Sequence, residues 1–138
     1  MSQMTAETSY IQRLSEGFVA EPQSVPAARH AAENVRGVLG SGICERVCLL
    51  VSELVTNAIS HRSRRSGNAV RMRVWTSPTS VRVAVSDRDP ASKLPTEPGR
   101  GELAVDGWGL YLMERIADRW GVRRRVGTEI WFEIDTEG

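Results

Sequence analysis

The chain has 138 residues, of which 25% are charged and 41% are hydrophobic, and its formal net charge at pH 7 is +1. This length suits one domain with a buried core, and the near-neutral charge gives no field that would recruit nucleic acid or a membrane surface. No apolar run approaches the roughly 20 residues that cross a bilayer. Residues 1–10 lack the apolar core of a signal peptide. We therefore expect a cytoplasmic protein that binds neither nucleic acid nor membrane.

Residues 1–23 are predicted to form a loose tail that includes an edge strand over 9–19. A helix is predicted next, because apolar residues recur at helical spacing from 27 to 39. Ser24 is expected to cap this helix, with Pro26 in its first turn.

A second helix is predicted over 43–61, after Gly40 and Gly42 separate it from the first. It contains two cysteines, Cys44 and Cys48, four residues apart. A structural metal needs more ligands, and the two histidines of the chain are not at metal-site spacing from them. We therefore expect both thiols to be small buried groups in a reducing compartment.

The apolar period then changes to two, which predicts a hairpin over 70–75 and 81–86. Residues 87–106 are irregular and rich in proline and glycine, and such a stretch inside a compact domain is usually functional. Helical spacing returns from 110 to 120, and Gly121 is expected to end that helix.

A final hairpin is predicted over 122–126 and 129–134, turning about Gly127 and Thr128. Strands paired mainly in hairpins indicate an antiparallel or mixed sheet, and amphipathic helices need a face to cover. The sequence therefore predicts an α+β fold: a two-layer α/β sandwich with the helices on one face of a mixed, mainly antiparallel sheet. Residues 24–138 are expected to form one domain.

Three polar residues of the second helix, Glu53, Asn57 and His61, recur every four positions and so form one slanted row. The row lies at the edge of the apolar stripe, where a polar side chain is costly without a partner. A carboxylate beside a carboxamide suits a hard cation such as magnesium. On this segment alone, the simpler interpretation is an ordinary amphipathic helix with a polar edge.

Two further polar features stand at the ends of regular elements. Asp87 follows a predicted core strand, although an aspartate there is more often a turn former than a ligand. Gly107-Trp108-Gly109 precedes a predicted helix, whose amides would suit phosphate, although two glycines alone are weak support for such a site.

Taken in order, four segments resemble one family: ELVTNAISH at 53–61, VSDRDP at 85–90, GWGLYLMERIADRWGV at 107–122 and GTEIWF at 127–132. They are similar to the GHKL, or Bergerat-type, ATPase domain of gyrase, Hsp90, histidine kinases and MutL. More narrowly, they resemble the stand-alone anti-sigma-factor serine kinases of bacteria, in particular the actinobacterial branch. The resemblance implies the histidine-kinase/Hsp90-like fold from about residue 24 to residue 134, with ATP and Mg²⁺ as cofactors.

The resemblance also implies a role for each matching residue. Glu53 matches the proposed general base, and Asn57 matches the magnesium ligand, whereas His61 has only a supporting place. Asp87 matches the carboxylate that accepts a hydrogen bond from the adenine amino group. Thr128 matches the threonine that reaches adenine.

At the phosphate end, Gly107 and Gly109 match the glycines that contact phosphate, and the lid is expected over about 88–106. Two residues depart from the family pattern. Asp89 stands where a glycine is often found, and Trp108 stands where the narrower branch often has arginine. Asp89 puts in doubt how strongly the site binds a nucleotide and which base it prefers. Trp108 puts in doubt the expected affinity for the nucleotide or the expected turnover. Trp108 would either pack against the sheet, which we favour, or over the nucleotide.

By this resemblance, the protein is expected to be a serine protein kinase that phosphorylates an anti-anti-sigma partner of the STAS type and sequesters a sigma factor. The alternative is a non-catalytic ATP-binding module that selects a protein partner through the state of its lid. A detached histidine-kinase catalytic domain is a weaker third interpretation, since no phosphoacceptor helix pair is present. Relatives of this kind often form homodimers, and the first strand and first helix are the expected contact surfaces.

Overall fold

A five-stranded antiparallel sheet forms the centre of the computed structural model, which describes residues 10–61, 69–87, 110–125 and 127–136. The strand order is β1-β2-β3-β5-β4, and each neighbouring pair is antiparallel. The predicted edge strand is therefore confirmed as β1. The strands are β1 (Ile11–Val19), β2 (Ala69–Thr76), β3 (Ser80–Asp87), β4 (Arg119–Arg125) and β5 (Gly127–Asp135).

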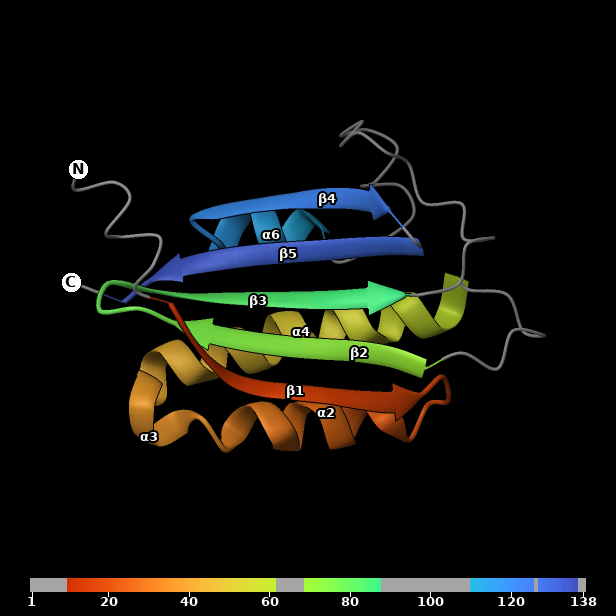
Figure 1. Ribbon diagram of the computed structural model, residues 1–138, viewed down its shortest axis with the longest axis horizontal. Helices are drawn as coiled ribbons and strands as arrows, with labels where there is room; N and C mark the ends of the chain where they lie inside the picture. The colour runs from red at the N-terminus through yellow and green to blue at the C-terminus, as the bar shows by residue number, and fades with distance from the viewer. Residues whose placement is uncertain (1–9, 62–68, 88–109, 126, 137–138) are drawn as a thin grey trace.

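The helices cover one face of this sheet and leave the other face open (Figure 1). The longest of them, α4, lies behind the centre of the sheet and packs against both α2 and α6. This arrangement confirms the predicted two-layer α+β fold. Within the described residues, no helix is long and apolar enough to cross a membrane. The helices are α2 (Ser24–Glu33), α3 (Arg36–Leu39), α4 (Ser41–His61) and α6 (Leu110–Ile116).

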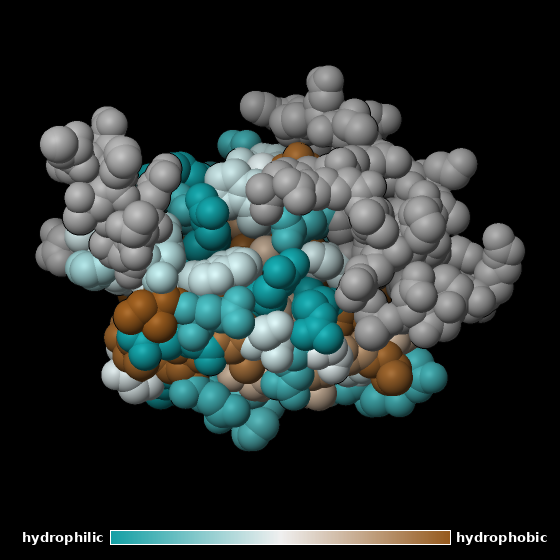
Figure 2. All heavy atoms as spheres, in the orientation of Figure 1, coloured by the Kyte–Doolittle hydropathy of each residue, from teal (hydrophilic) through white to brown (hydrophobic). Residues whose placement is uncertain are grey.

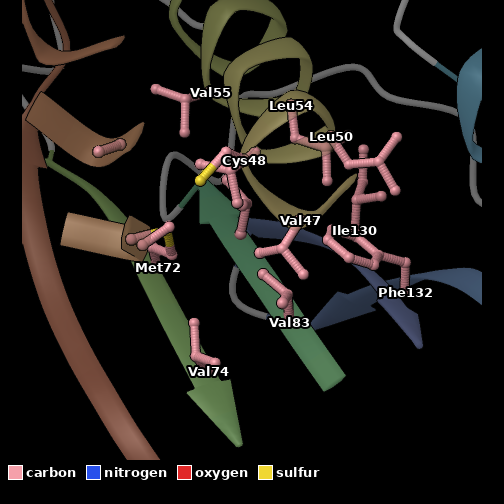
Figure 3. Close-up of a cluster of buried hydrophobic side chains, with 14 of the residues drawn as sticks. Val47, Cys48, Leu50, Leu54, Val55, Met72, Val74, Val83, Ile130 and Phe132 are labelled. Atoms are coloured by element: carbon pink, nitrogen blue, oxygen red, sulfur yellow. The ribbon is translucent and has the colours of Figure 1, made fainter. Parts of the chain in front are cut away.

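The core lies between α4 and the sheet, where apolar side chains of the helix face the inward side of the strands (Figure 3). In α4 these residues recur every three or four positions, and in the strands they alternate, as each geometry requires. Among the described residues, Phe132 of β5 is the largest fully buried side chain. This apolar core holds the helix layer against the sheet. Its members include Val47, Leu50, Leu54, Met72, Val74, Val83, Ile130 and Phe132.

The single helix predicted over 27–39 is wrong: the chain forms two helices, α2 and α3. The amides of Asn34 and Val35 donate to the carbonyls of Ala31 and Ala32, three residues back, which tightens the chain and ends the α-helical ladder. Ser24 does not cap α2, whose N-cap is Gln23. The Ser24 hydroxyl instead donates a hydrogen bond to the carbonyl of Val19 at 2.6 Å, and so links α2 to the end of β1.

The helix predicted over 110–120 is too long, because α6 ends at Ile116 and Trp120 belongs to β4. Trp120 pairs with Phe132 and packs at the core, so its apolar character serves a strand rather than a helix. Gly121, expected to end the helix, pairs with Trp131 inside the sheet. A β-carbon at Gly121 would lie 2.9–3.0 Å from the Trp131 ring, so only glycine allows that ring its place.

The final hairpin is confirmed with a shifted turn, since β5 already begins at Gly127 and this residue pairs with Arg125. The predicted turn residues, Gly127 and Thr128, are therefore part of the strand. The hairpin of β2 and β3 and the second helix are confirmed, with ends within two residues of the predicted ones.

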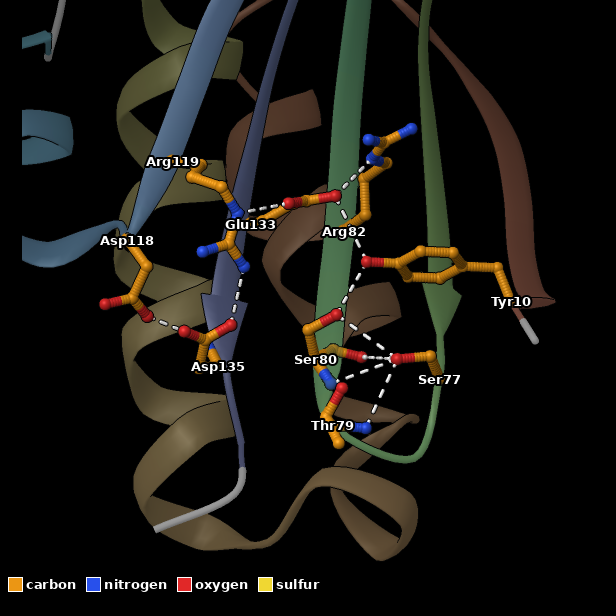
Figure 4. Close-up of polar contacts among 9 residues, drawn as sticks. All are labelled: Tyr10, Ser77, Thr79, Ser80, Arg82, Asp118, Arg119, Glu133 and Asp135. Carbon is orange, nitrogen blue, oxygen red and sulfur yellow. Dashed lines mark hydrogen bonds and ion pairs between the residues drawn. The ribbon is translucent and has the colours of Figure 1, made fainter. Parts of the chain in front are cut away.

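The open face of the sheet is mostly hydrophilic, and brown atoms gather toward its rim (Figure 2). Toward one end of this face, Glu133 is buried and accepts hydrogen bonds from Arg119 and Arg82 at 2.7 Å each and from Tyr10 at 3.1 Å (Figure 4). Burial alone would raise the pKa of Glu133, but the hydrogen bond from Arg119 and the charge of Arg82 hold it below its usual range. The cluster joins β3, β4, β5 and the residue before β1 at one end of the sheet.

We expect Gly121→Ala to destabilise the protein by about 1–3 kcal/mol, because the new methyl group must displace the Trp131 ring. Gly42→Ala is the matched control: a β-carbon there has no neighbour within 4 Å, and alanine in helix α4 should stabilise by about 0.5–1 kcal/mol. Urea unfolding of both variants measures the two changes. Equal effects of the two substitutions would contradict the close packing of Trp131 on Gly121.

Candidate functional site

The candidate site lies at the end of the sheet opposite the Glu133 cluster. Helix α4 runs in the same direction as β3 behind it, so the C-terminal ends of both elements lie together (Figure 1). Strand β5 begins at this end, because Asp87 pairs with Thr128 in the antiparallel register. The fold therefore brings three segments that are far apart in the sequence to one end of the sheet: the ends of α4 and β3 and the start of β5.

Asn57 is the polar residue of α4 that enters the buried layer. Asn57 is only 6% exposed. Its side-chain Nδ2 has no hydrogen-bond partner among the described residues. A buried amide without a partner costs about 1–3 kcal/mol, so its presence calls for an explanation. Rotation of the Asn57 carboxamide by half a turn exchanges its nitrogen and its oxygen, so either atom can face a ligand. Asn57 therefore fits the predicted role of a magnesium ligand.

Glu53 lies one helical turn before Asn57, at the border between the helix and solvent, and it is half-buried. Within the described part of the chain, its carboxylate forms no hydrogen bond or ion pair that would neutralise it. An accessible and uncommitted carboxylate is able to accept a proton from an incoming hydroxyl group. The helix thus carries a carboxylate and a carboxamide on one side, and their roles as base and magnesium ligand stay predictions.

Asp87 and Thr128 are described through their backbones alone. Asp87 is the last residue of β3, and it continues the series of every second position formed by Val81, Val83 and Val85, which are buried toward α4. The register therefore places position 87 on the helix-covered side of the sheet, with Thr128 as its neighbour across the strand pair. Their predicted roles toward adenine stay predictions.

The phosphate end of the predicted site lies outside the described residues. This holds for Gly107 and Gly109, for the lid at 88–106, and for Asp89 and Trp108. His61 is the last residue of α4, and its side chain is also outside the described set.

The two cysteines of α4 are buried, as predicted. Their Sγ atoms are 3.9 Å apart, and each lies 3.8 Å from a carbonyl oxygen of α2, that of Ala32 for Cys44 and that of Arg29 for Cys48. Burial, and then the neighbouring Cys44, raises the pKa of Cys48 to about 12. The two thiols therefore lie against the backbone of the neighbouring helix, and Cys48 is unsuited to act as a thiolate nucleophile.

Two exposed side chains of α4 and α6 were not singled out from the sequence. Leu49 precedes Glu53 by one turn, and Tyr111 lies in α6 just after the glycine segment. The signal was present, since Leu49 falls on the helix side opposite the apolar stripe, where a polar residue is typical.

We expect Asn57→Ala to leave the free energy of unfolding of the ligand-free protein unchanged or slightly raised, because it removes a buried amide whose nitrogen has no partner among the described residues. Val55→Ala is the matched control on the same helix, and loss of its fully buried side chain should cost about 2 kcal/mol. Chemical denaturation without nucleotide compares them. A loss for Asn57→Ala as large as that for Val55→Ala would mean that the amide stabilises the ligand-free fold.

Comparison with known proteins agrees with this geometry. A family model described as histidine kinase-like ATPase domain matches residues 18–134, which is most of the chain. A search of curated proteins found no significant match. Domains of this family bind ATP, and in general they do so with Mg²⁺. The chain belongs to the histidine kinase-like ATPase domain family.

Proposed function

We propose that this protein is a serine protein kinase that transfers phosphate from ATP, with Mg²⁺, to a STAS-type anti-anti-sigma protein, and that it also sequesters a sigma factor. The observation that carries the proposal is the presence on α4 of a buried amide, Asn57, beside an accessible carboxylate, Glu53, neither of which is satisfied by the described residues. The proposed location is the cytoplasm. The four ordered motifs and the family match support the ATP-dependent part of the proposal.

ATP would lie across the end of the sheet where α4, β3 and β5 meet. Asp87 would accept a hydrogen bond from the adenine amino group, and Thr128 would reach the same ring. Gly107 and Gly109 would contact the phosphates through their backbone amides. Asn57 would hold Mg²⁺, which supplies neutralisation of phosphate charge when it is bound.

Glu53 would act on the acceptor serine of the partner. Its carboxylate takes the proton of the serine hydroxyl while the hydroxyl oxygen bonds to the γ-phosphorus of ATP. The bond between that phosphorus and the bridging oxygen breaks, and ADP leaves. A carboxylate that is half-exposed on a helix is open to a hydroxyl that arrives on another protein.

The second candidate function is an ATP-binding module without catalysis, in which the lid state selects a protein partner. The sequence observations that favour it are Asp89, which stands two residues after Asp87 where the family often has glycine, and Trp108, which stands where the narrower branch often has arginine. In this case Glu53 has no reaction to serve.

A homodimer is part of the proposal. β1 is an outer strand of the sheet, and its exposed residues Ile11 and Val19 leave apolar surface for a second copy of the chain. Helix α2, which follows β1 directly, would extend the contact.

The proposal is tested by mixing the purified protein with γ-labelled ATP, magnesium and a panel of STAS-domain proteins. We expect at least one of them to be phosphorylated on serine, and Glu53→Gln to reduce the rate by about 100-fold or more, the usual contribution of a general base. Nucleotide affinity should stay within about twofold, since the carboxamide keeps the shape of the side chain. Glu45→Gln, two turns earlier on α4, is the control and should keep the wild-type rate.

The outcomes separate the two candidate functions. Absence of phosphotransfer to every member of the panel, with ATP binding intact, would reject the kinase and favour the non-catalytic module. Phosphotransfer that survives Glu53→Gln would keep the kinase and reject the role of this carboxylate.

A further inference from the structure

The open face of the sheet carries more positive than negative charge. Along β2, β3, β4 and β5, every second position lies on the side away from the helices, and the strand register aligns these outward positions in rows across the sheet (Figure 1). Six of the outward positions are arginine and three are acidic, whereas the formal net charge of the whole chain is only +1. The arginines are Arg71, Arg73, Arg82, Arg119, Arg123 and Arg125, and the acidic residues are Glu129, Glu133 and Asp135.

The charges at the Glu133 end of this face are paired with one another. Arg82 and Arg119 each lie 2.7 Å from a carboxylate oxygen of Glu133, and Arg119 also binds Asp135 at 2.6 Å. Two arginines therefore balance two carboxylates at this end. The excess of positive charge remains on the other half of the face, toward the end of the sheet that carries the candidate site.

The two arginines of β2 in that half keep hydrogen-bonding capacity. Arg71 donates to the hydroxyl of Ser15 at 3.0 Å, which is a neutral partner. Arg73 lies 3.5 Å from the carboxylate of Glu129, and its buried Nε has no hydrogen-bond partner among the described residues. A guanidinium carries five N–H donors, so the described contacts use only part of what these two groups offer.

Aromatic rings hold the arginines of this face in place. The guanidinium of Arg73 lies 5.7 Å from the ring centroid of Trp75, on the same strand. The guanidinium of Arg82 lies 5.0 Å from the ring centroid of Trp131 and 5.5 Å from that of Tyr10. A guanidinium that is already held by a ring loses less conformational freedom when it binds a partner. Aromatic residues and arginine are also the residue types enriched at protein interfaces.

We infer that the arginine face, formed by Arg71, Arg73, Trp75 and Trp131, binds an acidic segment of a partner protein. The planar guanidinium group matches a carboxylate in shape and charge and can bind it through two hydrogen bonds. Helix α4 lies on the opposite side of the sheet, so a partner on the arginine face would leave Glu53 accessible. Binding at this face therefore needs neither ATP nor the proposed kinase function.

The charge pattern favours a polypeptide over a nucleic acid. A nucleic-acid strand carries a phosphate at every nucleotide, and the carboxylates of Glu129, Glu133 and Asp135 on the same face would repel it. A polypeptide can place its own carboxylates beside Arg71 and Arg73 and other residue types beside the acidic positions. The partner is therefore a protein with a cluster of aspartate or glutamate residues.

Fluorescence anisotropy of a labelled oligoglutamate peptide, without nucleotide or magnesium, measures binding to this face. The variant is Arg71→Gln with Arg73→Gln. The matched control is Arg29→Gln with Arg46→Gln, which removes the same charge from exposed positions of α2 and α4. We expect the wild type to bind the peptide less tightly as salt rises, and the variant to raise the Kd by about fivefold or more, as loss of two ion pairs does. The control should keep the wild-type Kd, and an oligoglutamine peptide should not bind.

Urea unfolding shows whether the variant is folded, and Arg71→Glu replaces it if it is not, because Arg71 bonds to the hydroxyl of Ser15 rather than to the core. Absence of oligoglutamate binding by the wild type, or an equal loss in the variant and the control, would overturn the arginine face as a docking surface. Tighter binding of an oligothymidylate of the same length, with ATP present to fill the nucleotide site, would overturn the protein partner in favour of a nucleic acid. Failure of the kinase assay leaves each of these outcomes unchanged.

Discussion

The packing of α4 across the sheet is the constraint on which the rest of the structure depends. One side of this helix supplies much of the core, so its rotation about its own axis is fixed by burial. Once the rotation is fixed, the positions of Glu53 and Asn57 follow, because they stand at the edge of the apolar stripe. The same rotation forces Leu49 outward. The rotation of α4 against the sheet thus determines that the Asn57 amide is buried, the Glu53 carboxylate is accessible and Leu49 is exposed.

The two ends of the sheet differ in how their polar groups are satisfied. At one end, Glu133 is buried among Arg119, Arg82 and Tyr10, and its hydrogen-bonding capacity is used by the protein itself. At the other end, Asn57 is buried without a described partner for its amide nitrogen. Buried polar groups are normally paired, and an exception calls for an explanation, of which a missing ligand is one. The sheet therefore has a closed structural end and an end suited to bind a ligand.

The fold class was predictable because the periodicity of apolar residues changes clearly between α4 and the hairpin of β2 and β3. The errors arose where local spacing suits two structures. Ile116 and Trp120 are four residues apart, as on a helix, yet Trp120 lies in a strand and faces the same core. Gly121 looks like a helix end, but its role is to make room for the Trp131 ring, a contact set by tertiary packing. The break between α2 and α3 likewise depends on local hydrogen bonds that no apolar pattern encodes.

For the site, the row of Glu53 and Asn57 was predictable from helical spacing, but which of the two is buried was not. That difference depends on how α4 is rotated against the sheet, and it distinguishes Asn57, the proposed magnesium ligand, from Glu53, the proposed base. The roles of Asp87 and Thr128 came from resemblance, and the strand register adds that the two positions are neighbours. The sequence analysis overlooked Leu49 because a single apolar residue on a polar face is common and needs context to carry meaning.

Calorimetric titration of the protein with ATP and with ADP, each with and without magnesium, tests the central claim most directly. We expect both nucleotides to bind, and magnesium to strengthen ATP binding by about tenfold, or 1.4 kcal/mol, in the wild type but not in Asn57→Ala. Absence of binding heat for either nucleotide, with or without the metal, would contradict the assignment of the edge formed by α4, β3 and β5 as a nucleotide site.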